Sequence, residues 1–141
     1  MIGRAFLVAM MLLAVACSRS DPEKELRAAV ASMAQAIEQH RVADALEPVA
    51  DDFTRESGVF GKQDARRVLA ATMLRNEKIQ VSATVTEVRI EGDRAFAKVR
   101  VLATGGAGLL PERGQTWEFD TVWRRDRGVW KVFNAEWREG F

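Results

Sequence analysis

Hydrophobic positions follow a helical period in the first half of the chain and a strand period in the second half. From Leu26 to Ile37 an apolar residue recurs every three or four places, with polar side chains between. This spacing predicts a helix over Pro22–His40. Asp21 suits the N-cap because its carboxylate can accept a hydrogen bond from a free backbone N–H, and proline is favoured in the first turn.

Two further helices are predicted before the strands begin. Apolar residues between Val42 and Val49 indicate a short helix, which Pro48 should end or kink because proline has no backbone N–H. Helical spacing returns over Gln63–Asn76. Between these two helices, Gly58 and Gly61 frame a small predicted hairpin.

The region after Lys78 alternates between apolar and polar positions, which predicts β-strands. The apolar phase changes between Val85 and Val88, so a bulge is expected near Thr86-Glu87. Turns are predicted at Gly92-Asp93, in a flexible Gly-rich loop over Thr104–Gly114, and at Asp126-Arg127-Gly128. Four long antiparallel strands therefore follow three helices, which is an α+β layout with helices on one face of a sheet.

The final predicted strand, Val129–Trp137, carries large side chains on both of its faces. Strict alternation places Asn134 and Glu136 on the face that also carries Trp130 and Val132. If that face is the one turned to the helices, the two polar residues are candidates for contacts with a ligand. The alternative is that Glu136 pairs with an arginine on the outer surface. Phe133 and Trp137 lie on the opposite face, and since only one face can turn to the helices, the other requires a cover.

Composition indicates one globular domain of ordinary charge. The chain has 141 residues, of which 48% are hydrophobic and 29% charged, values that suit a folded domain rather than a disordered segment. Without Arg4 the remaining chain has 20 Lys and Arg against 20 Asp and Glu, so no basic excess points to nucleic acid. A single histidine, His40, and a single cysteine make a metal site unexpected, and no cofactor is expected. His40 is interpreted as a C-terminal helix cap.

The N-terminus has the pattern of a secretory signal. Ala5–Ala16 is an uncharged run of 12 residues, which is shorter than the roughly 20 that cross a bilayer. The segment Leu13-Ala14-Val15-Ala16-Cys17 resembles the lipobox of bacterial lipoproteins. The resemblance implies a signal peptide over residues 1–16, a diacylglycerol and palmitate anchor on Cys17, and a short linker over residues 17–21. The alternatives are a free cysteine inside a cleaved peptide and a membrane anchor helix.

The same resemblance implies a place for the protein. Ser18 follows the cysteine where an inner-membrane retention signal would have aspartate. The expected location is therefore the bacterial cell envelope, at the outer membrane and facing the periplasm, with residues 22–141 forming the domain.

Three short segments carry a second resemblance: Ala50-Asp51-Asp52-Phe53-Thr54, Gly61-Lys62-Gln63-Asp64-Ala65 and Gly128-Val129-Trp130-Lys131-Val132. With the order of elements, they make the chain resemble the nuclear transport factor 2-like (NTF2-like) superfamily, which includes ketosteroid isomerase and the SnoaL-like proteins. The resemblance implies a cone-shaped fold, with three N-terminal helices packed on a curved and mainly antiparallel sheet. It also implies a pocket at the open end, for which the candidate lining residues are Met33, Ile37, Phe53, Glu56, Phe60, Trp117, Phe119, Trp130, Val132, Asn134 and Glu136.

The isomerase chemistry of that superfamily is not expected in this chain. The position of the carboxylate base falls on Ser57, and the position of the oxyanion-binding tyrosine falls on Met33. A thioether donates no hydrogen bond, and the chain contains no tyrosine. Asp51, Asp52 and Glu56 could form an acid–base cluster, or they could be solvated residues that cap a turn.

Three functional hypotheses follow from these patterns. The first is a lipid-anchored, non-catalytic domain that binds a small hydrophobic ligand or an envelope protein. The second is a SnoaL-like enzyme that uses pocket carboxylates, and the third is a docking module of an envelope or secretion assembly. A homodimer through the outer sheet face is a further expectation from the superfamily, and Leu109-Leu110 could contact a partner, the bilayer or the sheet.

Overall fold

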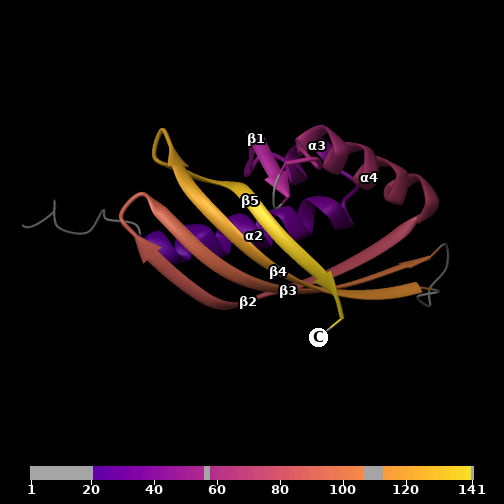
Figure 1. Cartoon of the computed structure of the whole chain (residues 1–141). Helices are drawn as coiled ribbons and strands as arrows, with labels where there is room; N and C mark the ends of the chain where they lie inside the picture. Colours follow the sequence, from indigo (N-terminus) through magenta and orange to yellow (C-terminus); the bar gives the residue numbers. More distant parts are fainter. Residues whose placement is uncertain (1–20, 56–57, 107–112, 141) are drawn as a thin grey trace, which may run out of the picture.

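The computed structural model describes residues 21–55, 58–106 and 113–140. Its helices and strands are α2 (Pro22–Glu38), α3 (Val42–Ala45), β1 (Val49–Arg55), α4 (Lys62–Arg75), β2 (Lys78–Glu91), β3 (Arg94–Gly106), β4 (Arg113–Asp126) and β5 (Val129–Glu139). The strands form one sheet in the order β1-β5-β4-β3-β2, with the helices on one side of it (Figure 1). No helix in these described ranges is both long and apolar enough to cross a membrane.

The α+β architecture predicted from the sequence is confirmed, with one addition. Four antiparallel strands were expected, and the structure has a fifth, because β1 pairs with β5 in parallel. The predicted hairpin between Gly58 and Gly61 is confirmed in a minimal form, since Thr54 bridges to Gly61 and the Arg55 N–H donates to the Phe60 carbonyl.

Helix α2 begins where the sequence predicts and ends two residues earlier. The Asp21 side chain accepts a hydrogen bond from the Glu23 N–H at 2.9 Å, which satisfies one of the free donors at the helix start. Gln39 takes the C-cap position, and His40 follows it with φ of 58°. The cap is therefore Gln39 and not His40, the residue that the sequence had suggested. His40 lies one residue beyond the helix, with a left-handed backbone.

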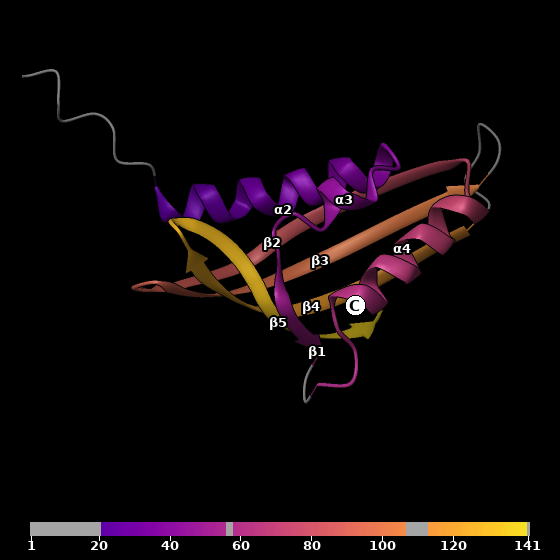
Figure 2. The same ribbon diagram turned by 90° about the horizontal axis from the view of Figure 1, so that it is seen from above.

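The core lies between α2 and the inner face of the curved sheet (Figures 1 and 2). Its most deeply buried large side chains are Leu26 of α2 and Trp123 of β4, and Trp130 of β5 is 2% exposed. Both indole N–H groups have acceptors, since Trp123 donates to Thr121 Oγ1 at 2.7 Å and Trp130 donates to the Pro22 carbonyl at 3.0 Å. This end of the molecule is closely packed, with its polar groups satisfied.

The bulge predicted in the first long strand is confirmed. The register of β2 against β3 shifts between Val85 and Glu87. Val85 pairs with Val99, and Val88 pairs with Ala97, so both valines of β2 lie on the inner face despite their odd separation.

A second bulge, in β5, makes one sequence prediction wrong. Trp123 pairs with Val132 while Val122 pairs with Asn134, so the residue between them, Phe133, has no partner in the ladder. The extra residue reverses the phase of the strand beyond it. Asn134 and Glu136 consequently lie on the outer face, and Trp137 lies on the inner face.

The predicted Gly-rich loop is also shorter than expected. Gly105 and Gly106 belong to β3, where they pair with Ile79 and Lys78 of β2. The part of the predicted loop that contains Leu109-Leu110 lies outside the described residues.

Candidate functional site

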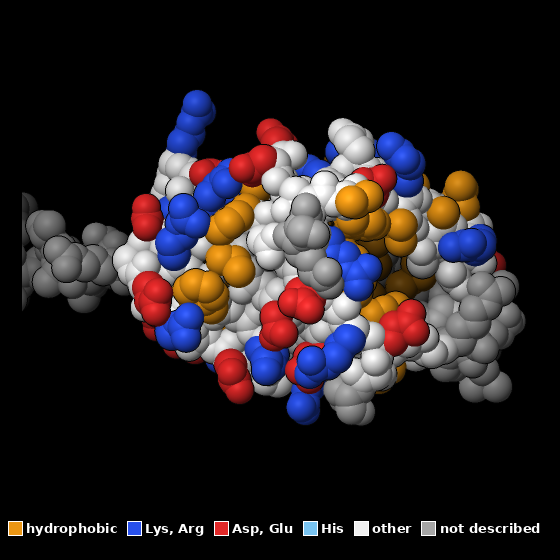
Figure 3. Space-filling model, in the orientation of Figure 1, with side chains coloured by type: hydrophobic (Ala, Val, Ile, Leu, Met, Phe, Trp, Pro, Cys, Tyr) orange, Lys and Arg blue, Asp and Glu red, His pale blue; other side chains and the backbone are white. Residues whose placement is uncertain are grey.

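A hollow lies between α4 and the sheet, at the opposite end from the packed core. Helix α4 contacts β1 and α3 but makes no extensive contact with β3 or β4, and only Met73 of its residues is buried. Leu74 is 89% exposed and Val68 is 53% exposed. Figure 3 shows the hollow with hydrophobic side chains on its floor and a Lys or Arg side chain at its rim. The helix therefore covers the sheet without filling the space beneath it.

Aromatic side chains gather on the inner face below this helix. The ring of Trp137 meets Phe60 edge-on, with centroids 5.3 Å apart, and it lies 5.5 Å from the ring of Phe119 at a tilt of 39°. We call Phe60, Phe119 and Trp137 the aromatic cluster. All three are half-buried, whereas Trp123 and Trp130 in the packed core are almost fully buried. The cluster therefore packs against the core on one side and keeps part of its apolar ring surface uncovered by the described residues.

Arg55 lies directly against this cluster. It is the last residue of β1 and sits beside Ala135 of β5 in the parallel ladder, which brings it close to Trp137. Its guanidinium lies 4.2 Å from the Trp137 ring centroid, and its Nη2 donates to the Trp137 carbonyl at 2.9 Å. Its Nε is buried and has no hydrogen-bond partner among the described residues. A cation with one unsatisfied donor therefore stands beside an exposed apolar surface.

The structure brings some of the predicted lining residues together. Phe60 and Phe119 belong to the aromatic cluster, and Trp117 is half-buried on the same face of β4. Met33 and Ile37 are half-buried on α2, and Met33 packs against the core. These residues lie on the inner side, as predicted.

Other predicted lining residues lie elsewhere. Phe53, Trp130 and Val132 are buried members of the core, so they hold the fold together. Asn134 and Glu136 are on the outer face because of the bulge at Phe133, and Glu56 and Ser57 lie outside the described residues. The sequence reasoning missed Arg55 and assigned Trp137 to the wrong face. The alternation from the buried Phe53 could have revealed Arg55, which follows it by two positions on the same strand face.

Of the three residues considered for an acid–base cluster, Asp51 and Asp52 each pair with a basic side chain, and Glu56 lies outside the described residues. Asp51 pairs with Lys62 at 3.1 Å and is fully exposed. Asp52 receives two hydrogen bonds from Arg124, at 2.7 and 2.9 Å, and these bonds lower the pKa of its carboxyl group below the ordinary value. A carboxylate held in the ionised form by a surface arginine is poorly suited to proton transfer.

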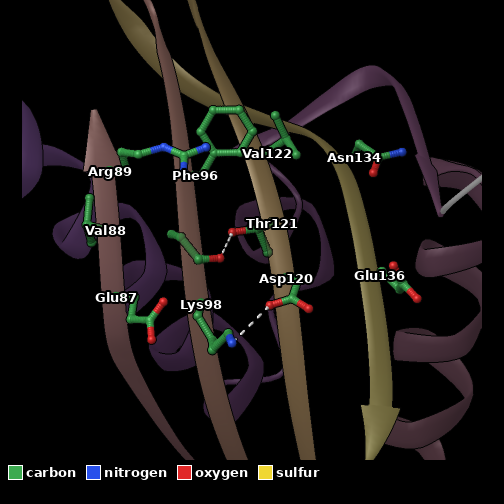
Figure 4. A pocket seen from close by; sticks show the side chains of 11 residues that line it. Glu87, Val88, Arg89, Phe96, Lys98, Asp120, Thr121, Val122, Asn134 and Glu136 are labelled. Atoms are coloured by element: carbon green, nitrogen blue, oxygen red, sulfur yellow. Dashed lines mark hydrogen bonds and ion pairs between the residues drawn. The ribbon is translucent and has the colours of Figure 1, made fainter. Parts of the chain in front are cut away.

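The outer face carries a separate, polar groove, which Figure 4 shows in close-up. Arg89 stacks over Phe96 at 4.4 Å, and Lys98 pairs with Asp120 at 3.9 Å. Asn134, in the same groove, donates to the Thr54 carbonyl at 3.1 Å. Arg89, Lys98 and Asn134 thus each have a partner within the chain, so these groups are less available to a ligand than the aromatic cluster is.

The outer aromatic residue of β5 is covered as well. The guanidinium groups of Arg94 and Arg124 lie 4.9 and 5.3 Å from the ring of Phe133. Trp137 points inward, so Phe133 is the one large aromatic side chain of β5 on the outer face. The argument that this face needs a partner to cover it therefore no longer holds. The homodimer remains a prediction without that support.

Comparison with known proteins adds evidence about the fold. No protein-family model matches the chain, and no curated protein matches its sequence. Solved structures do match, including a candidate scytalone dehydratase from Novosphingobium aromaticivorans, with a TM-score of 0.71, 10% identity and 84% coverage of each chain. A candidate dehydratase of the NTF2-like family from Streptomyces avermitilis matches with a TM-score of 0.67 and 20% identity, covering 84% of this chain and 95% of its own.

A third similar structure is an NTF2-like protein of unknown function from Shewanella oneidensis. Its TM-score is 0.66 at 10% identity, and the match covers 83% of this chain and 98% of that one. These identities are too low to transfer an activity, but the agreement in shape identifies the predicted cone-shaped fold.

Proposed function

Since the domain has the NTF2-like fold, we propose that it binds a small hydrophobic ligand in the hollow between α4 and the sheet, without catalysing a reaction. The observation that carries this proposal is the half-buried aromatic cluster beneath a helix that is itself largely unpacked. An apolar ligand would remove the ring surface of the aromatic cluster from water, and the free energy of that transfer favours binding.

The enzyme hypothesis has less support from the described residues. It needs an acid or base facing the hollow. Asp52 is bound to Arg124, and Asn134 and Glu136 lie on the outer face. These three groups are thus directed elsewhere, and Glu56 lies outside the described residues, so the described part of the chain favours binding over catalysis.

The membrane anchor is a separate part of the proposal and rests on the sequence alone. Cys17 would carry the lipid and hold the domain at the envelope membrane, most simply on the periplasmic side of the outer membrane. Residues 1–20 lie outside the described part of the chain.

The ligand proposal is tested with residues 18–141, because the described domain corresponds to nearly the whole length of the solved Streptomyces and Shewanella proteins. The neutral fluorescent probe N-phenyl-1-naphthylamine should bind with enhanced emission. Leu69→Trp enlarges a half-buried side chain of α4 that packs toward the core, and it should lower the affinity about tenfold.

The neighbouring substitution Val68→Trp is the matched control, since Val68 is 53% exposed and its enlargement should leave probe binding unchanged. Native mass spectrometry of the same domain would detect any retained small molecule. A folded domain that binds no probe and retains no ligand would overturn the proposal and favour the docking hypothesis.

A further inference from the structure

We propose that Arg55 recognises an anionic head group, so that the ligand of the hollow is an amphipathic carboxylate. The carboxylate would pair with the guanidinium, and the apolar part would pack on the aromatic cluster. This inference rests on the proposed function, because it names the chemical class of the ligand for the same hollow.

The first argument is the incomplete compensation of the Arg55 charge. A guanidinium stays ionised at physiological pH and offers five N–H donors. Within the described chain, the only hydrogen bond that the Arg55 side chain donates goes to the Trp137 carbonyl, and its buried Nε donates to no acceptor there. The stacking on Trp137 is itself favourable, but the buried Nε–H has no acceptor among the described residues, so an anion that accepts from it would gain from the position.

The second argument is an internal precedent at the packed end of the molecule. Arg125 stacks on Trp130 at 4.3 Å, almost the same geometry as Arg55 on Trp137 at 4.2 Å. There, however, the stacked arginine also pairs with the carboxylate of Glu25 at 2.6 Å. At the hollow the stacking distance is nearly the same, and no carboxylate of the described residues pairs with Arg55, so a ligand would supply it.

The third argument concerns which anion fits. The guanidinium fork can bind carboxylate or phosphate through paired hydrogen bonds. Arg55 is a single cation beside aromatic rings, and a single positive charge balances a monoanion. A phosphate dianion would keep an uncompensated charge next to the apolar surface, so a carboxylate is favoured.

The experiment compares decanoate with decanol, which share an apolar chain and differ in the head group. Binding to residues 18–141 is measured by isothermal titration calorimetry. Decanoate should bind about tenfold more tightly than decanol, as expected for a hydrogen-bonded charge pair. Arg55→Met should remove this preference, so that decanoate binds no more tightly than decanol. Arg89→Met is the control, because Arg89 also stacks on an aromatic ring but lies on the outer face.

The possible outcomes distinguish a failure of the carboxylate inference from a failure of the proposed hydrophobic binding function. Equal binding of decanoate and decanol to the unsubstituted domain would overturn the carboxylate inference and leave the hydrophobic hollow in place. Failure of both to bind would overturn the function as well. If Arg55→Met does not fold, the unsubstituted domain still gives the head-group comparison, and Arg55→Lys, which keeps a positive charge, should retain part of the preference.

Discussion

The side chain of Asn76 occupies the space that a side chain at Gly105 would need. A Cβ atom built on Gly105 would lie 2.7 Å from Asn76 Oδ1 and 2.9 Å from its Cγ. Asn76 is only 7% exposed and donates from Nδ2 to the Thr72 carbonyl at 2.9 Å, at the end of α4. The glycine therefore allows the end of α4 to pack directly on β3, within the strand rather than in a turn.

Gly105→Ala should lower the free energy of unfolding by about 1–3 kcal/mol, because the added methyl group would force apart two closely packed segments. Urea unfolding monitored by circular dichroism measures the effect. In an Asn76→Ala background the same substitution should cost clearly less. Gly114→Ala is the control, since its Cβ would make only an ordinary contact, 3.8 Å from Thr104 Cγ2. Equal costs at the two glycines would contradict the packing argument.

The Thr121 hydroxyl links two elements of the core. It donates to the Ala97 carbonyl at 2.7 Å and accepts from the indole of Trp123, also at 2.7 Å, and that indole belongs to a side chain only 1% exposed. Thr121→Val keeps the shape and leaves the indole N–H without an acceptor, so it should cost about 1–3 kcal/mol in unfolding free energy. Thermal or urea denaturation measures this cost.

Thr121→Ser separates the hydroxyl from the methyl group of the side chain. It keeps the acceptor and should be clearly more stable than Thr121→Val. If the serine variant loses as much stability as the valine variant, packing of the methyl group, not the hydrogen bond, accounts for the role of Thr121.

The two bulges show which parts of the sheet could be predicted from the sequence. In β2 the apolar phase changes visibly between Val85 and Val88, and the predicted bulge is there. In β5 the large residue Phe133 is compatible with either face, so strict alternation was assumed through it and the positions beyond it were assigned to the wrong side. A bulge is readable from the sequence only when the residues around it have an unambiguous preference for one face.

The site was harder to predict than the helices and strands. Helices were predicted from local spacing, and their bounds agree to within a few residues. Arg55 meets Trp137 because β1 joins β5 in parallel, a pairing between segments about 80 positions apart that no local pattern specifies. The local order of residue types therefore predicts the helices and strands. The position of the site depends on long-range strand pairing, which the local order does not specify.

The proposed anchor gives a prediction for the full-length protein. Cys17→Ala should remove the lipid and release the protein from the membrane fraction, because the acyl chains supply the membrane affinity. Fractionation with immunoblotting measures the release, and mass spectrometry of the N-terminal peptide measures the lipid. Ser18→Ala is the matched control and should remain membrane-bound. Persistent membrane association of an unlipidated Cys17→Ala protein would contradict the lipoprotein interpretation and favour an anchor helix.

The ion pair between Asp52 and Arg124 gives a pH-dependent prediction. Because Arg124 lowers the pKa of the Asp52 carboxyl in the folded state, the contribution to stability is present above the unfolded value near 3.8 and is lost as pH falls through the folded value. Asp52 is 65% exposed, so Asp52→Asn should cost no more than about 1 kcal/mol at neutral pH. In urea unfolding from pH 7 to pH 3, the difference between the unsubstituted protein and Asp52→Asn should shrink below about pH 4. In an Arg124→Ala background, Asp52→Asn should have little effect at any pH, and a difference that grows on acidification would contradict this account.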